Sequence, residues 1–196
     1  MAFLDKNYWT ERYSYGKTGW DIGFASPPLV QYLDQIKNKE IQVLIPGAGS
    51  GYEAAYGWKS GFHNLQLLDL SYEPLERFKS LNPSFPLDHI HHEDFFLHTG
   101  KYDLILEQTF FCALDPGLRV DYAKKMKELL SPGGKIAGVW FDREFDFEGP
   151  PFGGKSEEYR FLFEKYFEVH TFAPCYNSIP ERLGSEVFMI LENSKI

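Results

Sequence analysis

One short stretch of this sequence limits the folds open to the chain more than any other. The segment 41–45, Ile-Gln-Val-Leu-Ile, is mostly apolar and β-branched, which predicts a buried strand. Glycines follow at Gly47, Gly49 and Gly51, and the segment 52–58 has the composition of a helix. A strand, a glycine-rich turn and a helix in this order are typical of the ligand-binding corner of a doubly wound α/β sheet. Gly47 and Gly49 lack a Cβ atom, so a ligand can approach the backbone closely there.

The spacing of these glycines and a later carboxylate indicate which ligand the corner binds. A dinucleotide fold prefers G-x-G-x-x-G, whereas this chain has G-x-G-x-G, with Tyr52 in place of the third glycine. The segment 65–71 predicts a second strand, and Asp69 lies near its end, 20 residues after Gly49. A carboxylate at this place accepts hydrogen bonds from the ribose hydroxyls of an adenosine ligand. The alternative role for Asp69 is a helix cap, although Ser71 is the better cap for the helix that follows.

Composition and length describe a globular chain. Its 196 residues predict a single domain over 1–196, in which the N-terminal segment 1–23 is a candidate lid. No apolar run approaches the ~20 residues of a membrane span, and no signal-peptide pattern opens the chain. The two cysteines, Cys112 and Cys175, are too few for a disulfide framework, and they predict a reduced cytoplasmic setting. The net charge of −8 argues against nucleic acid or an anionic membrane as partner. We expect a monomer.

Strand and helix patterns alternate along the rest of the chain. Strands are predicted at 41–45, 65–71, 88–92, 101–107, 136–141, 167–172 and 186–191. Helices are predicted at 27–36, 52–58, 71–81, 120–130 and 156–166. The alternation predicts an α/β fold with a seven-stranded, mostly parallel, Rossmann-like sheet and helices on both faces.

Aromatic side chains gather before the first strand, at Trp9, Tyr13 and Trp20. Trp9 and Tyr13 are four residues apart, so they share one face if this segment is a helix. Two interpretations stay open. The rings are either a hydrophobic anchor for an N-terminal arm, or a lid that covers a cationic ligand by cation–π contact.

Polar residues at the carboxyl ends of two later strands are further candidates. Glu107 ends the fourth predicted strand and Gln108 follows it, at the edge where ligands bind in open α/β sheets. Asp94 and Phe95 follow the third, and could offer an adenine ring a carboxylate and an aromatic face. The alternative is a solvated carboxylate beside a core phenylalanine.

The histidines at 89, 91 and 92 raise the question of a metal site. His89 and His91 share a strand face only if the strand is regular, and no matching Cys/His pair lies elsewhere. We therefore expect no metal.

Several stretches together resemble the thiopurine methyltransferase superfamily of S-adenosylmethionine-dependent methyltransferases, close to the plant halide/thiol methyltransferase branch. They are Trp9-x-x-Arg12-Tyr13-x-x-Gly16-x-Thr18-x-Trp20-Asp21-x-Gly23, Pro46-Gly47-x-Gly49-x-Gly51, Asp69-Leu70-Ser71, Asp94-Phe95-Phe96, Phe110-Phe111-Cys112-Ala113, Gly149-Pro150-Pro151-Phe152 and Ile179-Pro180-x-Arg182-x-Gly184. The glycine motif is shared by all Rossmann-like methyltransferases. The N-terminal string and the loops 110–113 and 149–152 are far more specific.

The resemblance implies a class I methyltransferase fold with an antiparallel last strand, and a role for each matching residue. The implied contacts to S-adenosylmethionine are a lid of Trp9, Tyr13 and Trp20, then Gly47 and Gly49 at the methionine end, Asp69 and Leu70 at the ribose, Asp94 and Phe95 at the adenine, and Glu107. Glu107 and Gln108 are the implied residues of the reacting centre. The implied acceptor contacts are Gln108, Phe111, Pro151, Phe152 and Arg182.

The implied activity is transfer of a methyl group to a small soft nucleophile (a thiol, sulfide or halide) by in-line displacement, which needs no catalytic triad or metal. If the acceptor must lose a proton, the candidate bases are Glu107, Asp142 and His170. The halide branch has a tyrosine, and thiopurine methyltransferases an arginine, where this chain has Gln108. We therefore rank thiols and sulfide before halides. Two alternatives remain, a non-catalytic adenosyl-binding protein and a nicotinamide oxidoreductase, and the missing third glycine counts against the latter.

Overall fold

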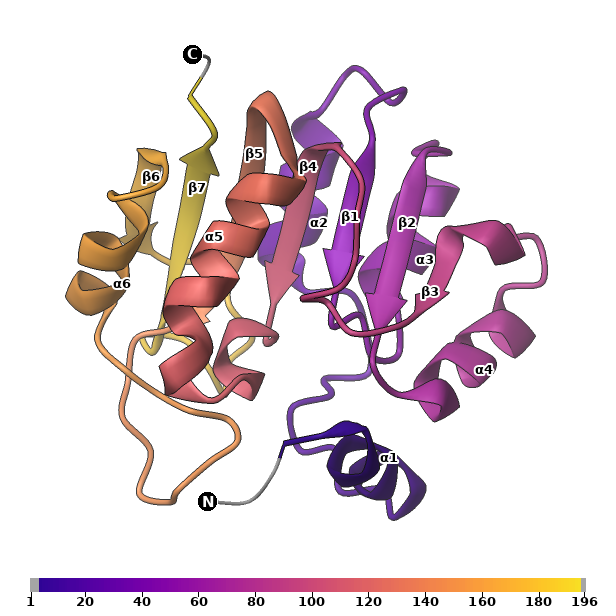
Figure 1. The fold of residues 1–196 in the computed structure, drawn as a ribbon, viewed down its shortest axis with the longest axis horizontal. Coiled ribbons are helices and arrows are strands. Elements are labelled where there is room, and N and C mark those ends of the chain that lie inside the picture. Colours follow the sequence, from indigo (N-terminus) through magenta and orange to yellow (C-terminus); the bar gives the residue numbers. More distant parts are fainter. Residues whose placement is uncertain (1–3, 195–196) are drawn as a thin grey trace.

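A seven-stranded sheet forms the centre of the computed structural model, which describes residues 4–194 (Figure 1). The first three residues of the expected lid lie outside this range. The strands are β1 (Val43–Pro46), β2 (Leu65–Asp69), β3 (Ile90–His92), β4 (Tyr102–Gln108), β5 (Leu130–Phe141), β6 (Glu168–Pro174) and β7 (Glu186–Glu192), in the order β3-β2-β1-β4-β5-β7-β6. Neighbours from β3 to β5 pair in parallel, and β7 is antiparallel to both β5 and β6. The predicted Rossmann-like sheet with an antiparallel last strand is confirmed.

Helices cover both faces of this sheet. They are α2 (Pro27–Gln35), α3 (Tyr52–Lys59), α4 (Tyr72–Leu81), α5 (Arg119–Leu129) and α6 (Ser156–Phe163), and a further helix, α1 (Lys6–Ser14), precedes them in the chain. The core has two parts: α2, α3 and α4 share one hydrophobic cluster, while α5 and α6 share the other. Leu44 in β1 belongs to the α5 side, and its neighbours Val43 and Ile45 belong to the α2 side, as strand alternation requires. No helix within 4–194 has both the length and the apolarity to cross a membrane.

Helix α1 covers neither face. It lies beyond the carboxyl ends of β1 and β2, next to α4 (Figure 1). Its N-cap is Asp5, whose carboxylate accepts a hydrogen bond from the Tyr8 backbone N–H at 2.9 Å. None of its residues is fully buried. Packing of α1 therefore differs from that of a core helix, and its place is set by what lies at this edge of the sheet.

The fifth strand begins six residues before its predicted start. Leu130 already pairs with Tyr102, and the ladder then shifts register before it resumes at Lys135. The segment 131–134 was expected only to end the preceding helix, because its Ser-Pro-Gly-Gly composition is that of a turn. A register shift accommodates these residues within the strand.

Candidate active site

A cavity of about 600 Å³ lies where the parallel strands end and the N-terminal arm begins. Small-molecule sites typically measure roughly 300–1,000 Å³. The structure brings twelve of the predicted site residues together in its lining: Trp9, Tyr13, Trp20, Gly47, Gly49, Asp69, Leu70, Asp94, Phe95, Gln108, Pro151 and Arg182. Glu107, Phe111 and Phe152 are not in the lining.

The glycine turn is one wall of this cavity. The backbone φ angles of Gly47, Gly49 and Gly51 are 59°, 51° and 70°. Residues other than glycine rarely adopt such positive values. A Cβ atom on Gly47 would overlap the ring of Phe110, and one on Gly49 would lie 2.8 Å from the Tyr13 hydroxyl. In this structure the side chains of Phe110 and Tyr13 therefore occupy the space beside Gly47 and Gly49 that the absence of a Cβ atom leaves open.

Asp69 forms the adjoining wall and also holds the turn in place. Its Oδ2 accepts a hydrogen bond from the Gly49 N–H and its Oδ1 accepts one from the Ser71 N–H, both at 2.8 Å. Burial raises the pKa of Asp69. The Ser71 hydroxyl, expected to cap α4, has no partner among the described residues. Each oxygen of the Asp69 carboxylate keeps a lone pair for a ligand in the cavity.

Two polar contacts hold the N-terminal arm over this edge. Asp21 Oδ2 accepts a hydrogen bond from the Ser50 hydroxyl at 2.7 Å, which ties the arm to the glycine turn. The Arg182 guanidinium Nη2 donates to the Trp20 carbonyl at 2.7 Å, which ties the arm to the segment between β6 and β7. Arg182 also lies 3.6 Å from a carboxylate oxygen of the buried Glu186. The guanidinium group predicted to contact the acceptor therefore also attaches the arm to the rest of the protein.

The rings of the arm pack as a cluster around Trp20. Trp9 and Tyr13 contact it edge-to-face, with centroid distances of 5.6 and 5.7 Å. The Arg12 guanidinium lies 5.3 Å from the Trp20 ring. Burial, and then the charge of Asp69, raise the pKa of Tyr13, so its hydroxyl stays protonated. Because all three rings line the cavity, the arm has the placement of a lid.

Glu107 and Phe111 lie behind the cavity wall. One Glu107 oxygen, Oε1, accepts hydrogen bonds from the N–H groups of Phe110 and Phe111 at 3.0 Å, and Oε2 accepts from the Tyr122 hydroxyl at 2.7 Å. Burial raises the pKa of Glu107 to about 7. Phe111 is 1% exposed and packs on Tyr122, Tyr159 and Phe163. Glu107 thus shapes the loop after β4 from its inner side.

Gln108 faces the cavity from the end of β4. Its Oε1 is buried and has no hydrogen-bond partner among residues 4–194. The next residue, Thr109, has φ of 57°, an unfavourable value for a β-branched residue, and it also lines the cavity. Backbone strain of this kind gathers at functional sites. Nothing in the sequence signals it.

The adenine candidates Asp94 and Phe95 both reach the cavity. Asp94 Oδ1 accepts a hydrogen bond from the Phe96 N–H at 2.9 Å, and its second oxygen has no such contact. Phe95 is 4% exposed and packs edge-to-face on Phe96 and Phe110. Phe95 is thus a core phenylalanine, as one alternative predicted, and it also forms part of the cavity wall, where the other alternative needs it.

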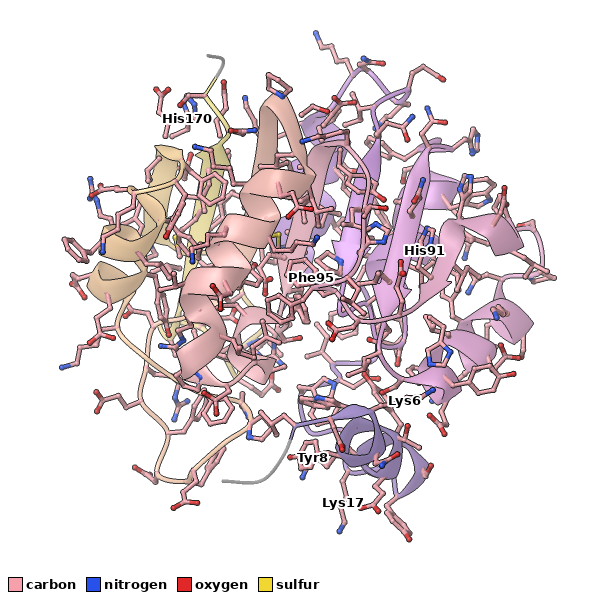
Figure 2. The ribbon with its side chains drawn as sticks, in the orientation of Figure 1. Lys6, Tyr8, Lys17, His91, Phe95 and His170 are labelled. Carbon is pink, nitrogen blue, oxygen red and sulfur yellow. The ribbon has the colours of Figure 1, made fainter. Side chains whose placement is uncertain are left out.

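The other candidate bases lie away from the cavity. Both Asp142 oxygens are engaged at the start of α6, by the Ser156 N–H at 2.8 Å and its hydroxyl at 2.9 Å. His170 lies at the end of the molecule opposite the arm that carries Tyr8 (Figure 2), with Nε2 3.0 Å from Glu192. Neither residue is in the lining.

Phe152 supports the loop that carries the two lining prolines. Its N–H donates a hydrogen bond to the Cys112 carbonyl at 2.7 Å. Pro150 and Pro151 line the cavity beside Cys112. The specific loops 110–113 and 149–152 therefore meet, although the ring of Phe152 is not in the wall.

Three acidic residues of the cavity lining were not predicted: Asp21, Glu53 and Asp115. Asp21 follows Trp20, and its motif position could have indicated it. Glu53 lies in the first turn of α3, where an acidic side chain is favoured, and its Oε1 accepts the Ser26 N–H at 2.8 Å. Burial raises the pKa of Glu53. The lining thus has more carboxylates than cations.

Comparison with known proteins agrees with this geometry. The family described as Thiopurine S-methyltransferase (TPMT) matches residues 4–187. "Probable thiol methyltransferase 2" of Arabidopsis thaliana is 31% identical over 185 residues, which cover 91% of this chain and 81% of the relative. "Thiocyanate methyltransferase 1" of Brassica oleracea is 30% identical over 154 residues, covering 76% of this chain and 68% of the relative.

Solved structures show the same fold at lower sequence identity. The 1,6-didemethyltoxoflavin-N1-methyltransferase of Burkholderia thailandensis, with bound S-adenosylhomocysteine, has a TM-score of 0.77 at 17% identity and covers 97% of this chain and 87% of its own. Magnesium protoporphyrin IX methyltransferase of Synechocystis, also with S-adenosylhomocysteine, has a TM-score of 0.72 at 12% identity, covering 96% and 97%. The chain therefore belongs to the thiopurine S-methyltransferase family and is an S-adenosylmethionine-dependent methyltransferase.

Proposed function

We propose that this enzyme methylates a small sulfur nucleophile, a thiol or hydrosulfide, in the cavity between the arm and the sheet. The observation that carries the proposal is the wall around Gln108. Most of its neighbours there are apolar, namely Phe110, Cys112, Ala113, Leu114, Leu118, Pro150 and Pro151. The carboxamide oxygen of Gln108 has no partner in the described part of the chain. A small, soft, partly apolar acceptor suits such a wall.

The opposite wall fits the methyl donor. In this proposal Asp69 accepts hydrogen bonds from the ribose hydroxyls with its free lone pairs, and Leu70 packs beside it. Asp94 accepts from the adenine amino group while Phe95 packs on the ring. Burial raises the pKa values of Asp69 and Glu53, and a cationic ligand nearby would favour their ionised forms. The excess of carboxylates over cationic side chains in the cavity lining therefore supports a methyl donor that carries a positive charge.

The arm and the glycine turn complete the donor side. Gly47 and Gly49 leave room for the methionine end, on condition that the Tyr13 hydroxyl and the Phe110 ring adjust. Trp9, Tyr13 and Trp20 then cover the ligand, where aromatic faces attract a cation and exclude water.

Alignment is the main contribution of the protein to the reaction. S-adenosylmethionine supplies a methyl group on a positively charged sulfur, from which a nucleophile displaces it in line. Gln108 orients the acceptor, donating an N–H to an anionic sulfur. Glu107, Phe111 and Phe152 act through the loops that they support. Arg182 supplies positive charge among the described lining residues.

The proposal also predicts which thiols are preferred. In this proposal no side chain removes a proton from the acceptor. Glu107, next to Gln108 in sequence, lies behind the wall with both oxygens hydrogen-bonded. Asp115 of the lining accepts the Gly117 N–H at 2.8 Å. The acceptor must then arrive as a thiolate, and acidic thiols supply more of it at neutral pH. Names of the relatives support sulfur chemistry, since they refer to thiol, thiocyanate and thiopurine acceptors.

Competition between acceptors tests this proposal. Hydrosulfide, an aryl thiol, thiocyanate and iodide are supplied at equal concentration, and methylated products are identified by mass spectrometry. We expect the aryl thiol and hydrosulfide to be methylated first. Gln108→Leu should lower kcat/KM for the thiol, and the surface change Gln35→Leu should not. Fastest methylation of iodide would contradict the ranking, and a rise in iodide turnover in Gln108→Tyr would place this residue on the acceptor side.

A further inference from the structure

A cluster of two histidines and a glutamate lies outside the active cavity, at the end of β3 and in the loop that follows. Glu93 Oε1 is 2.6 Å from His98 Nδ1 and 3.9 Å from His91 Nδ1. One potential ligand atom of each residue lies within 4.8 Å of the others. His91 projects from β3 at the edge of the sheet (Figure 2).

Hydrogen bonds behind the cluster orient both imidazole rings. The Tyr102 hydroxyl donates to Gln66 Oε1 at 3.0 Å, so its oxygen accepts from His98 Nε2 at 2.7 Å. Gln66 Oε1 also accepts from His91 Nε2 at 2.8 Å. Nδ1 of each histidine thus faces Glu93. The 2.6 Å contact between His98 Nδ1 and Glu93 Oε1 is a hydrogen bond, and a bound ion would displace its proton.

Such an arrangement is that of a metal centre with its supporting shell. Metal-binding histidines donate their second N–H to an oxygen acceptor, as both rings do here. Two imidazole nitrogens and one carboxylate oxygen form a donor set of zinc sites that leave a fourth position open. Bonds of zinc length place tetrahedral ligands about 3.3 Å apart, between the two observed Glu93–His distances.

We propose that His91, Glu93 and His98 bind a divalent transition-metal ion of the zinc class. The side chains of Glu93 and His91 are 41% and 27% exposed, so an ion can enter from solvent, while His98 is 3% exposed. This departs from the expectation of no metal, which considered His89 as the partner of His91. His98 was missed because it follows a loop whose path the sequence does not show.

The site would act on the donor cavity through the chain. Residues 94–96 lie between two of its ligands and line the cavity. An ion bound at both ends of this loop would hold Asp94 and Phe95 in place. The ion would thus restrain the loop from the outside, with solvent at its fourth position.

Metal titration of tag-free, chelator-treated protein tests the binding. Calorimetry with Zn²⁺ and the visible absorption of Co²⁺ should show one bound ion. His91→Gln and Glu93→Gln should each weaken Zn²⁺ binding by about tenfold or more, and Tyr102→Phe by roughly 10- to 100-fold. His63→Gln, a change at an exposed histidine outside the cluster, should bind as the wild type does. Two results would contradict the proposed site: no Zn²⁺ binding by the wild type, or a wild-type affinity for Zn²⁺ in both His91→Gln and Glu93→Gln.

Hydrogen exchange tests the structural role. The amides of Phe96, Leu97 and His98 all donate to Asp94, so their exchange reports on the loop. Zn²⁺ should slow it by about tenfold in the wild type, and leave it unchanged in His91→Gln. Unchanged exchange in wild-type protein with Zn²⁺ bound would show that the ion does not hold the loop.

Discussion

Asp69 holds the glycine turn and also lines the cavity. Its inner lone pairs fix the backbone of Gly49 and Ser71, and its outer lone pairs face the cavity. A carboxylate has enough acceptor capacity for both. Alternatives that the sequence left open, a structural and a ligand-binding residue, therefore do not exclude each other.

Replacing Asp69 separates these functions. In Asp69→Ala we expect the dissociation constant for S-adenosylhomocysteine to rise by about 10- to 100-fold, since charge-assisted contacts are worth roughly 1.5–3 kcal/mol. Calorimetry measures the constant, and urea unfolding measures the accompanying loss of stability. Asp88→Ala, at an exposed carboxylate, is the control. Lower stability with an unchanged dissociation constant would assign Asp69 to the turn alone.

Glu107 predicts a pH dependence of stability. Its pKa rises from an ordinary 4.5 to about 7 on folding, so between these pH values the folded chain binds more protons than the unfolded chain. Stability is then fully present below pH 4.5 and falls as pH rises through 7, by up to about 3 kcal/mol. Urea unfolding from pH 5 to 8 should show a smaller fall in Glu107→Gln. The exposed Glu144→Gln should keep the wild-type slope; equal slopes in all three would refute the assignment.

At the residue scale, the sequence indicates which side chains reach the cavity where a strand end places them. Asp69 and Gln108 are the last residues of β2 and β4, and both line the cavity. Successive strand residues point to opposite faces, so Glu107 and Gln108 could not both do so. Which of the two faces inward depends on the packing of α5, which no single segment reveals. The positive φ of Thr109 could not be predicted from the sequence either, because the folded loop imposes it.

At the scale of elements, the arm differs from the helices of the core. Helices α2 and α5 were predictable because an apolar stripe faces the sheet. Helix α1 has no fully buried residue, and the polar contacts of Asp21 and Arg182 hold its segment. Such contacts join residues far apart in sequence, so the composition of the arm left lid and anchor equally open.

Deleting residues 1–23 tests the lid. The sheet and both core clusters lie outside this segment, so we expect a folded protein. Donor binding should weaken by several-fold or more, since cation–π contacts are worth about 0.5–2 kcal/mol, and methyl transfer should cease. Asp21→Asn, which weakens one attachment, should show a smaller effect. If the arm is only an anchor, the truncated protein will lose stability but keep its donor affinity per folded molecule.

At the scale of the whole molecule, donor binding is linked to stability. The cavity walls come from the glycine turn after β1, from β2, β4, the arm and the loop near 150, so a ligand that fills the cavity connects all of them. At 100 times its dissociation constant, a ligand specific for the folded state adds about 2.7 kcal/mol.

We therefore expect S-adenosylhomocysteine to raise Tm by roughly 5–10 °C for a chain of this size. Differential scanning fluorimetry measures the shift, with adenosine alone as the comparison ligand that lacks the methionine end. Asp69→Ala should show a smaller shift at the same ligand concentration. No shift at millimolar S-adenosylhomocysteine would contradict the assignment of this cavity to the donor.

The two attachments of the arm also bear on the order in which ligands bind and leave. If the donor binds beneath Trp9, Tyr13 and Trp20 as proposed, it must enter before Asp21 and Arg182 make their contacts, and S-adenosylhomocysteine must leave after these contacts break. We then expect ordered binding, in which S-adenosylhomocysteine leaves last and competes with the donor, and in which opening of the arm limits turnover.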